Sequence, residues 1–141
     1  MSKTKYLYTT DGSDKIMVID EKQWRQVKTI SVKFKNGAKL SNINELEILQ
    51  KEVNQYASQE LVELQLRRQK YIFANQFLKS DVHLINLETG VVQHTWDMSH
   101  LLSLQKDYAK QKGGFYDWGN DVLNGIAYNF KNDNFILTGK Q

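Results

Sequence analysis

An internal repeat restricts the fold of this chain more than any other feature of its sequence. A shift of 66 residues places Ile16–Asp20 on Val82–Asn86, and the same shift, without a gap, places Thr29-Ile30 on Thr95-Trp96. A short apolar run, a turn and a second run therefore recur together. Recurrence of such a unit is the sequence signature of repeat folds, in which each copy packs against its neighbours.

A second correspondence indicates the length of the repeat. Asn44–Ile48 matches Asn124–Tyr128 at a shift of 80, and Ile72–Ala74 matches Ile136–Thr138 at a shift of 64. The difference of 16 residues falls in the link between the paired runs, so the first copy carries an insertion. Without the insertion the period is about 46 to 50 residues, close to the roughly 40 to 50 residues of a four-stranded propeller blade.

The runs between turn residues predict about nine short strands. Asn, Asp and Gly supply the turns, because the chain contains no proline. The predicted strands are Lys5–Thr9, Lys15–Asp20, Gln26–Val32, Leu46–Leu49, Tyr71–Phe77, Val82–Leu87, Val91–Asp97, Leu123–Tyr128 and Phe135–Thr138. Several runs are apolar on both faces, which is typical of stacked sheets. The sequence therefore predicts an all-β fold, a partial β-propeller of about two to three four-stranded blades.

Two segments favour helices inserted into this fold. The insertion, residues 51–70, has apolar side chains at near-helical spacing and predicts a surface helix or helical arm. Its rear half, Glu60–Leu66, also alternates well enough to form a strand paired with Tyr71–Phe77. Met98–Gln111 is the second helix candidate. We expect residues 1–141 to form one domain that carries these pieces as connections.

Composition excludes several classes of function. The net charge of +3 comes from interspersed charges and does not indicate a nucleic-acid partner. No apolar run is long enough to span a membrane, and no signal peptide is visible, so we expect a soluble domain whose compartment stays open. The chain has no cysteine, and His83, His94 and His100 lack metal-ligand spacing. We therefore predict no metal and no cofactor.

Six short strings in a fixed order carry a resemblance to a known family. They are Thr10–Ser13, Asn44–Glu47, Ala74-Asn75, Ile85–Gly90, Asp121–Tyr128 and Thr138–Lys140, of which the last two together are the most distinctive. The chain resembles the later blades of the plant and bacterial glutaminyl-peptide cyclotransferases, which are five-bladed propellers. The resemblance covers nearly the whole chain except residues 51–70 and about 106–119.

The resemblance implies a metal-independent reaction on a peptide. The α-amine of an N-terminal glutamine attacks its own side-chain amide carbonyl, expels ammonia and leaves pyroglutamate. This chemistry needs a carboxylic acid to carry the proton, donors for the developing oxyanion, and an aromatic surround that orients the side chain.

Three residues of this chain match positions that serve the reaction in the family. The resemblance implies that Asn44 and Lys140 are catalytic, with Asn44 donating to the substrate amide or oxyanion, and that Phe77 binds substrate through its aromatic face. The family usually has tryptophan where Phe77 stands. Plainer interpretations are open for each residue: a turn or bulge asparagine, a solvated lysine and a core phenylalanine.

The departures from the family pattern predict an incomplete propeller. The family's early-blade strings, one of which carries its proton-shuttling glutamate, are absent, so no catalytic acid can be assigned. No glutamate of the chain stands in such a string; the ones considered are Glu21, Glu45, Glu47, Glu52, Glu60, Glu63 and Glu88. The chain stops at Gln141 after about two and a half blades, too few to close a ring. A truncated gene model is the simplest alternative explanation of the missing blades.

Open blades expose strand edges and apolar faces, so we expect a partner to cover them. The candidates are another protein chain that carries the missing blades, a copy of the same chain, or a larger complex. Two functions remain open at this point: part of a split glutaminyl cyclase that acts with its partner, or a non-catalytic interaction subunit built on the same fold. An unrelated repeat protein is a third option.

Overall fold

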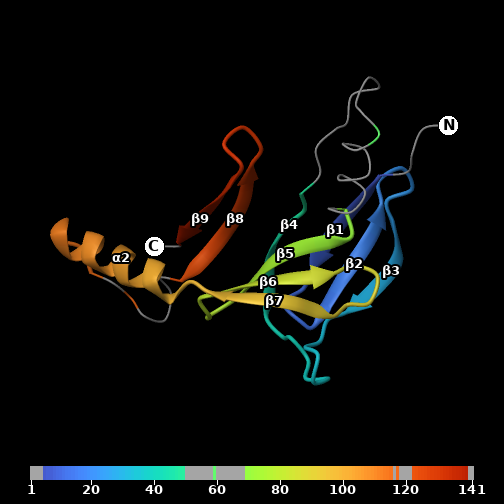
Figure 1. The fold of residues 1–141 in the computed structure, drawn as a ribbon, viewed down its shortest axis with the longest axis horizontal. Helices are drawn as coiled ribbons and strands as arrows, with labels where there is room; N and C mark the ends of the chain where they lie inside the picture. The colour runs from blue at the N-terminus through green and yellow to red at the C-terminus, as the bar shows by residue number, and fades with distance from the viewer. Residues whose placement is uncertain (1–4, 50–58, 60–68, 116, 118–121, 140–141) are drawn as a thin grey trace.

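The computed structural model describes residues 5–49, 59, 69–115, 117 and 122–139, and its chain forms three antiparallel sheets in sequence order (Figure 1). The first sheet holds β1 (Tyr6–Thr10), β2 (Lys15–Asp20) and β3 (Arg25–Ser31). The second holds β4 (Ile43–Glu47), β5 (Tyr71–Gln76), β6 (Asp81–Asn86) and β7 (Val92–Asp97). The third holds β8 (Leu123–Asn129) and β9 (Asn134–Gly139).

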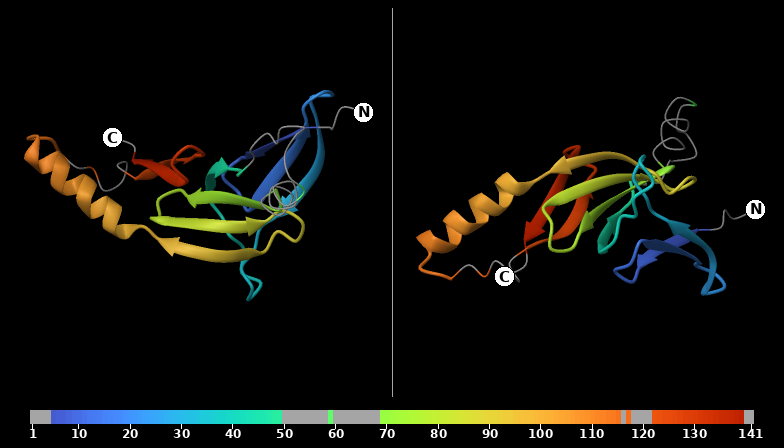
Figure 2. Two further views of the ribbon diagram at one scale, coloured as in Figure 1. Left: turned by 45° about the horizontal axis from the view of Figure 1, so that its top comes forward. Right: turned by 90° about the horizontal axis from the view of Figure 1, so that it is seen from below.

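The predicted strands and the all-β fold class are confirmed. Each of the nine predicted strands overlaps one observed strand, with ends that differ by a few residues. The three sheets contain three, four and two strands, and Figure 2 shows them side by side in chain order. This arrangement is that of successive propeller blades.

Strand register confirms the 66-residue repeat. In the first sheet Ile16 lies opposite Ile30, and in the second sheet Val82 lies opposite Trp96. A register irregularity also occurs at the same place in both hairpins, between Val18 and the next residue and between its counterpart Leu84 and the next residue. The repeat is therefore a repeat of backbone geometry as well as of sequence.

The turns that close these two hairpins are equivalent as well. The Asp20 carboxylate accepts the backbone N–H groups two and three residues later at 2.8 and 3.0 Å, and the Asn86 amide oxygen does the same at 2.9 and 3.0 Å. Trp24 and Gly90 then take the left-handed conformation, with φ of 50° and 70°. Asp and Asn favour such turns because their short side chains bond nearby backbone groups.

The predicted shift of 64 between β5 of the second sheet and β9 of the third sheet is wrong by one residue. Ile43 lies opposite Gln76 in the second sheet, and Leu123 lies opposite Gly139 in the third. The shift from the second sheet to the third is therefore 80 residues for the first strands, β4 and β8, and 63 residues for the second strands, β5 and β9. A one-residue slip turns every side chain to the other face, and a few aliphatic matches in sequence cannot distinguish the two registers.

Apolar side chains fill the spaces between adjacent sheets. The larger cluster lies between the first and second sheets and is formed by the buried residues Ile16, Val18, Ile30, Val32, Leu40, Ile43, Ile72, Ala74, Ile85, Leu87 and Val92. A smaller cluster, built on Val82, Leu123 and Ile126, lies between the second and third sheets. Each sheet thus has an apolar surface wherever another sheet covers it.

The helix predicted at Met98–Gln111 is confirmed as α2 (Ser99–Gln111), which follows β7 and extends away from the first sheet (Figure 2). The predicted helical insertion, residues 51–70, lies almost entirely outside the described residues. The alternative, a strand at residues 60–66 beside β5, also lies outside the described residues; in the described sheet β4 and β6 flank β5. Within the part of the chain that the structure describes, no helix is long and apolar enough to cross a membrane.

Candidate functional site

The candidate site lies where the first strands of the second and third sheets, β4 and β8, run next to each other. Both strands are irregular near their starts: the register of β4 shifts between Ile43 and Leu46, and that of β8 shifts between Leu123 and Gly125. Such bulges re-aim side chains and are common beside functional sites.

Asn44 and Asn124 occupy these two bulges and contact each other. The Asn44 Nδ2 group donates a hydrogen bond to Asn124 Oδ1 at 3.0 Å, and both side chains are half-buried. The two residues are related by the 80-residue shift of the repeat. Equivalent asparagines of neighbouring sheets therefore form an amide pair between the edge strands β4 and β8.

Asn75 supports this pair from β5. Its side chain is buried; Oδ1 accepts the Glu45 N–H at 2.7 Å, and Nδ2 donates to the Leu123 carbonyl oxygen at 2.9 Å. The first sheet makes the same kind of link, because Thr10 Oγ1 donates to the Ile43 carbonyl oxygen at 3.1 Å. Thr10 near the end of β1 and Asn75 near the end of β5, the equivalent strand, thus each hold the first strand of the next sheet.

Phe77, the predicted substrate-binding residue, lies at the same end of the second sheet as Asn44. It follows β5, its backbone N–H donates to the Asn42 carbonyl oxygen at 2.8 Å, and its side chain is exposed. Lys140 lies outside the described residues, but it follows Gly139 as Phe77 follows Gln76, and both preceding residues end equivalent strands. Asn44 and Phe77 therefore share one end of a sheet, with no recorded contact between their side chains.

Sequence reasoning missed Asn75 and Asn124 as members of this site. The signal for Asn124 was the repeat itself, which aligns it with Asn44. Asn75 stood in the Ala74-Asn75 string, but only the structure shows that its amide joins β4 to β8.

The amide cluster can bind a carbonyl group but cannot move a proton. Asparagine side chains donate and accept hydrogen bonds and do not titrate. Glu47, a half-buried carboxylate on β4, accepts the Tyr128 backbone N–H at 3.0 Å and so links β4 to β8. Among the described residues, no three His, Asp or Glu side chains gather as metal ligands.

One buried titratable group lies on the other face of the second sheet. His83 Nδ1 is 2.9 Å from Thr95 Oγ1, its ring meets the Phe34 ring edge-on, and its Nε2 has no hydrogen-bond partner among the described residues. Burial lowers the pKa of His83 below 6.5, and the nearby charge of Asp81 opposes this effect. His83 is therefore neutral near pH 7 and belongs to the packing between the first two sheets.

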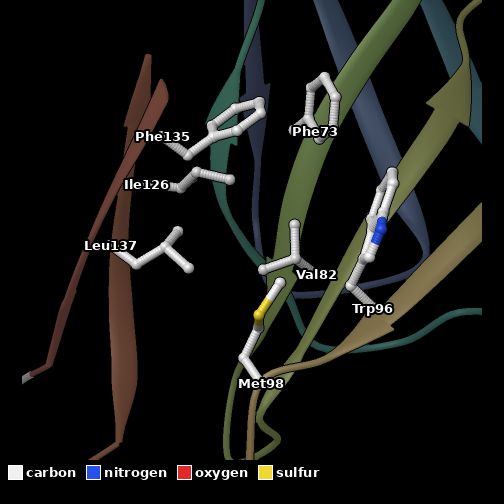
Figure 3. Close-up of a pocket in the computed structure, with 7 residues that line it drawn as sticks. All are labelled: Phe73, Val82, Trp96, Met98, Ile126, Phe135 and Leu137. Atoms are coloured by element: carbon white, nitrogen blue, oxygen red, sulfur yellow. The ribbon is translucent and has the colours of Figure 1, made fainter. Parts of the chain in front are cut away.

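An apolar groove of about 260 Å³ opens between the second and third sheets (Figure 3). One wall comes from the second sheet and the residue that follows it, the other from β8 and β9, and the side chains of the two walls point toward each other (Figure 3). Its lining residues are Phe73, Val82, Trp96, Met98, Ile126, Phe135 and Leu137.

The family model of glutamine cyclotransferase matches residues 1–141. The chain belongs to the glutamine cyclotransferase family. The predicted family resemblance is thereby confirmed. No curated protein matches the chain significantly.

A solved structure supports the same relationship. The crystal structure of Myxococcus xanthus glutaminyl cyclase is 25% identical to this chain, with a TM-score of 0.69. The match covers 99% of this chain and 48% of that protein. This glutamine cyclotransferase family member therefore spans about half the length of its solved relative and has the fold of a partial propeller of that type.

Proposed function

We propose that this chain supplies part of a site that converts N-terminal glutamine into pyroglutamate. The glutamine α-amine would form a C–N bond with the side-chain amide carbon, the bond from that carbon to the amide nitrogen would break, and ammonia would leave. A proton passes from the attacking amine to the leaving nitrogen. The match of the family model over all 141 residues is the observation that carries this proposal.

Asn44 is the best-supported substrate contact in the described residues. Asn124 accepts a hydrogen bond from one N–H of the Asn44 amide and so holds that amide in place. Because the amide is planar, the direction of its second N–H is fixed as well. A preorganised donor of this kind stabilises the oxyanion that develops on the amide carbonyl. In the same proposal Lys140 supplies positive charge at the site and Phe77 offers an aromatic face to the glutamine side chain.

We propose that the proton shuttle comes from outside the described residues. The amides around Asn44 cannot carry a proton, and Glu47 is engaged by the backbone of β8. We therefore propose that activity needs a partner that contributes a carboxylic acid and covers the open sheets. The solved relative, of which this chain spans 48%, contains further residues that could supply such a group.

A non-catalytic role as an interaction subunit is the second candidate. The observation in its favour is that the asparagine contacts are structural: Asn75 joins β4 and β8, and Asn44 joins Asn124. These bonds would hold the sheets together whether or not a substrate binds.

Ammonia release from a peptide with N-terminal glutamine separates the two roles. The chain is purified with any chain that accompanies it, and the mixture is assayed with Asn44→Ala and Lys140→Ala variants. Asn132→Ala and Lys131→Ala are matched controls, because both side chains are exposed. Catalysis requires ammonia release that falls at least about 100-fold in the first two variants and persists in the controls. Equal rates in all four variants, or no release with a co-purifying partner bound, support the structural role.

A further inference from the structure

The amide pair of Asn44 and Asn124 has more hydrogen-bonding capacity than the fold uses. A primary amide side chain carries two N–H donors and one acceptor oxygen. The bond from Asn44 Nδ2 to Asn124 Oδ1 occupies only one of the donors, and among the described residues the structure records no other hydrogen bond for either side chain. The second N–H of Asn44, both N–H groups of Asn124 and the Asn44 Oδ1 oxygen are therefore available to a ligand.

The backbone presents the two side chains in similar ways. Strand pairing joins Leu123 and Gly125 to consecutive residues of β9 and leaves Asn124, between them, without a partner residue. Asn44 lies within the corresponding register shift of β4, and both side chains are half-buried. Bulges re-aim the side chains that they carry. Polar groups that leave water usually find partners, so unused donors in such a position indicate a binding site.

The two strands are fixed against each other by other side chains. Asn75 accepts the N–H of Glu45, next to Asn44, and donates to the carbonyl oxygen of Leu123, next to Asn124. Further along the same strands, the Glu47 carboxylate of β4 accepts a backbone N–H of β8. The amide pair is therefore held at a fixed position before any ligand binds, which is the condition for preorganised donors.

The unused groups match those of a primary carboxamide. A carboxamide has an acceptor oxygen beside an NH2 donor, and the free N–H and the oxygen of Asn44 offer the reverse pattern. Asn124 Nδ2 is bonded to the same carbon as the oxygen that Asn44 contacts, so its donors are one amide away from the Asn44 N–H. A carboxylate has no donor, and one of its oxygens would face the Asn44 oxygen with no proton between them.

We propose that Asn124 is a second substrate contact and that the Asn44–Asn124 pair recognises the side-chain carboxamide of glutamine. Asn44 exchanges two hydrogen bonds with the carboxamide, and Asn124 Nδ2 donates a third to its carbonyl oxygen. As the bond from the amine to the amide carbon forms, these two donors hold the oxyanion. When the bond to the amide nitrogen breaks, Asn44 Oδ1 holds the departing ammonia, and the proton moves as in the proposed function.

This inference rests on the proposed function and adds to it a residue and a reason for choosing glutamine over glutamate. The probes are Nα-acetylglutamine N-methylamide and Nα-acetylglutamate N-methylamide, which cannot cyclise because the α-amine is acetylated. Each is titrated near pH 7 into the isotope-labelled full chain, and the asparagine NH2 signals are followed by NMR. Loss of a signal in Asn44→Asp or Asn124→Asp assigns it. Asn36 and Asn132 are internal controls, because both side chains are exposed.

We expect the glutamine probe to shift the signals of Asn44 and Asn124 along one saturation curve and to leave the two control signals unchanged. The glutamate probe should bind at least about tenfold more weakly, because it leaves the Asn44 oxygen without a donor.

The Asn124→Asp variant separates substrate contact from positioning. The new carboxylate can still accept the bond from Asn44 but has no N–H, so the glutamine probe should bind at least about tenfold more weakly. Asn132→Asp makes the same chemical change at an exposed residue and should bind like the unaltered chain. Asn124→Ala should weaken binding as Asn124→Asp does, which guards against an effect of the new charge. The backbone NMR signals report whether each variant is folded.

The inference is overturned by any of four results. They are the absence of a saturable shift up to the solubility limit of the glutamine probe, a response of Asn44 without Asn124, equal affinity for the two probes, and equal affinity in Asn124→Asp and Asn132→Asp. Ammonia release that depends on Asn44 and not on Asn124 would uphold the proposed function and overturn this inference. Selective carboxamide binding without ammonia release would support this inference and count against the activity.

Discussion

The first and second sheets enclose a large apolar core of eleven buried residues, whereas the second and third sheets enclose a small one built on Val82, Leu123 and Ile126. Equivalent positions line both spaces, so residue type does not explain the contrast. Among the described residues, the difference lies in the number of strands, four in the second sheet and two in the third. A blade face that is fully apolar in sequence is thus buried only as far as the neighbouring blade extends.

Truncation of one equivalent residue in each interface should give the largest contrast. Ile30→Ala removes a buried side chain from the closed interface and should lower the free energy of unfolding by about 3 kcal/mol. Trp96→Ala removes a larger side chain, yet it should cost only about 1 kcal/mol because Trp96 borders the open groove. Urea unfolding of both variants measures the two costs. A greater cost for Trp96→Ala would show that the groove is already closed.

The polar links between sheets should give the next effect. Asn75→Ala leaves the Glu45 N–H and the Leu123 carbonyl oxygen without their side-chain partner and should cost about 2 kcal/mol. Asn75→Thr should recover part of this loss, because Thr10 makes the equivalent link between the first two sheets. Thermal unfolding of both variants provides the comparison. Equal losses in the two variants would mean that the link is not transferable between the interfaces.

The pH dependence of stability should report on the closed interface. His83 has a lowered pKa in the folded chain because it is buried, so the unfolded chain binds the proton more readily. The contribution of neutral His83 to the free energy of unfolding should therefore be fully present above pH 6.5. Below that pH it should fall by about 1 kcal/mol per pH unit until the pH drops below the pKa of His83 in the folded chain. Unfolding curves between pH 5 and 7.5 test this, with each pH value about half a unit apart.

His83→Met supplies the control, because Met17 holds the equivalent position in the first sheet. This variant should lose the pH dependence in that range. Asp11 and Asp97 have pKa values lowered from 3.8 by hydrogen bonds at Ser13 and Ser99, so their contribution disappears only at more acidic pH. An unchanged slope in His83→Met would assign the effect to other groups.

The two equivalent hairpin turns should give the smallest effect. Trp24 adopts a left-handed φ with an exposed side chain, so Trp24→Gly should stabilise the chain by about 0.5 to 1 kcal/mol. Gly90→Ala should have the opposite sign, because an added Cβ would overlap the Ser31 carbonyl oxygen of the first sheet. Melting temperatures of the two variants are compared. Destabilisation by both would contradict the equivalence of the turns.

Periodicity and turn chemistry made most of the fold predictable. The 66-residue match was strong because β2, β3 and the turn between them all repeat. Asp20 and Asn86 even make equivalent hydrogen bonds in the two turns. The match of β5 to β9 rested on a few aliphatic residues, which are compatible with two registers, and its predicted shift was therefore one residue too long.

The candidate site was less predictable from the sequence. Asn44 was found through the family resemblance, but the partnership of Asn44 with Asn124 depends on how adjacent sheets are stacked. The same holds for Asn75, whose two bonds reach β4 and β8 across separate segments of the chain. Contacts between sheets follow from tertiary packing, which local sequence patterns do not predict.

The most direct test of the half-filled interface is to complete the third sheet within the chain. By the 63-residue shift Gln141 corresponds to Leu78, so a copy of residues 79–97 fused after Gln141 would supply the equivalents of β6 and β7. The measurement is the free energy of urea unfolding. The account predicts that this free energy rises by at least about 1 kcal/mol, since three aliphatic side chains of the added hairpin and the exposed side chains of Trp96 and Phe135 become buried. An unchanged or lower value would contradict the claim that the groove is a copy of the closed interface.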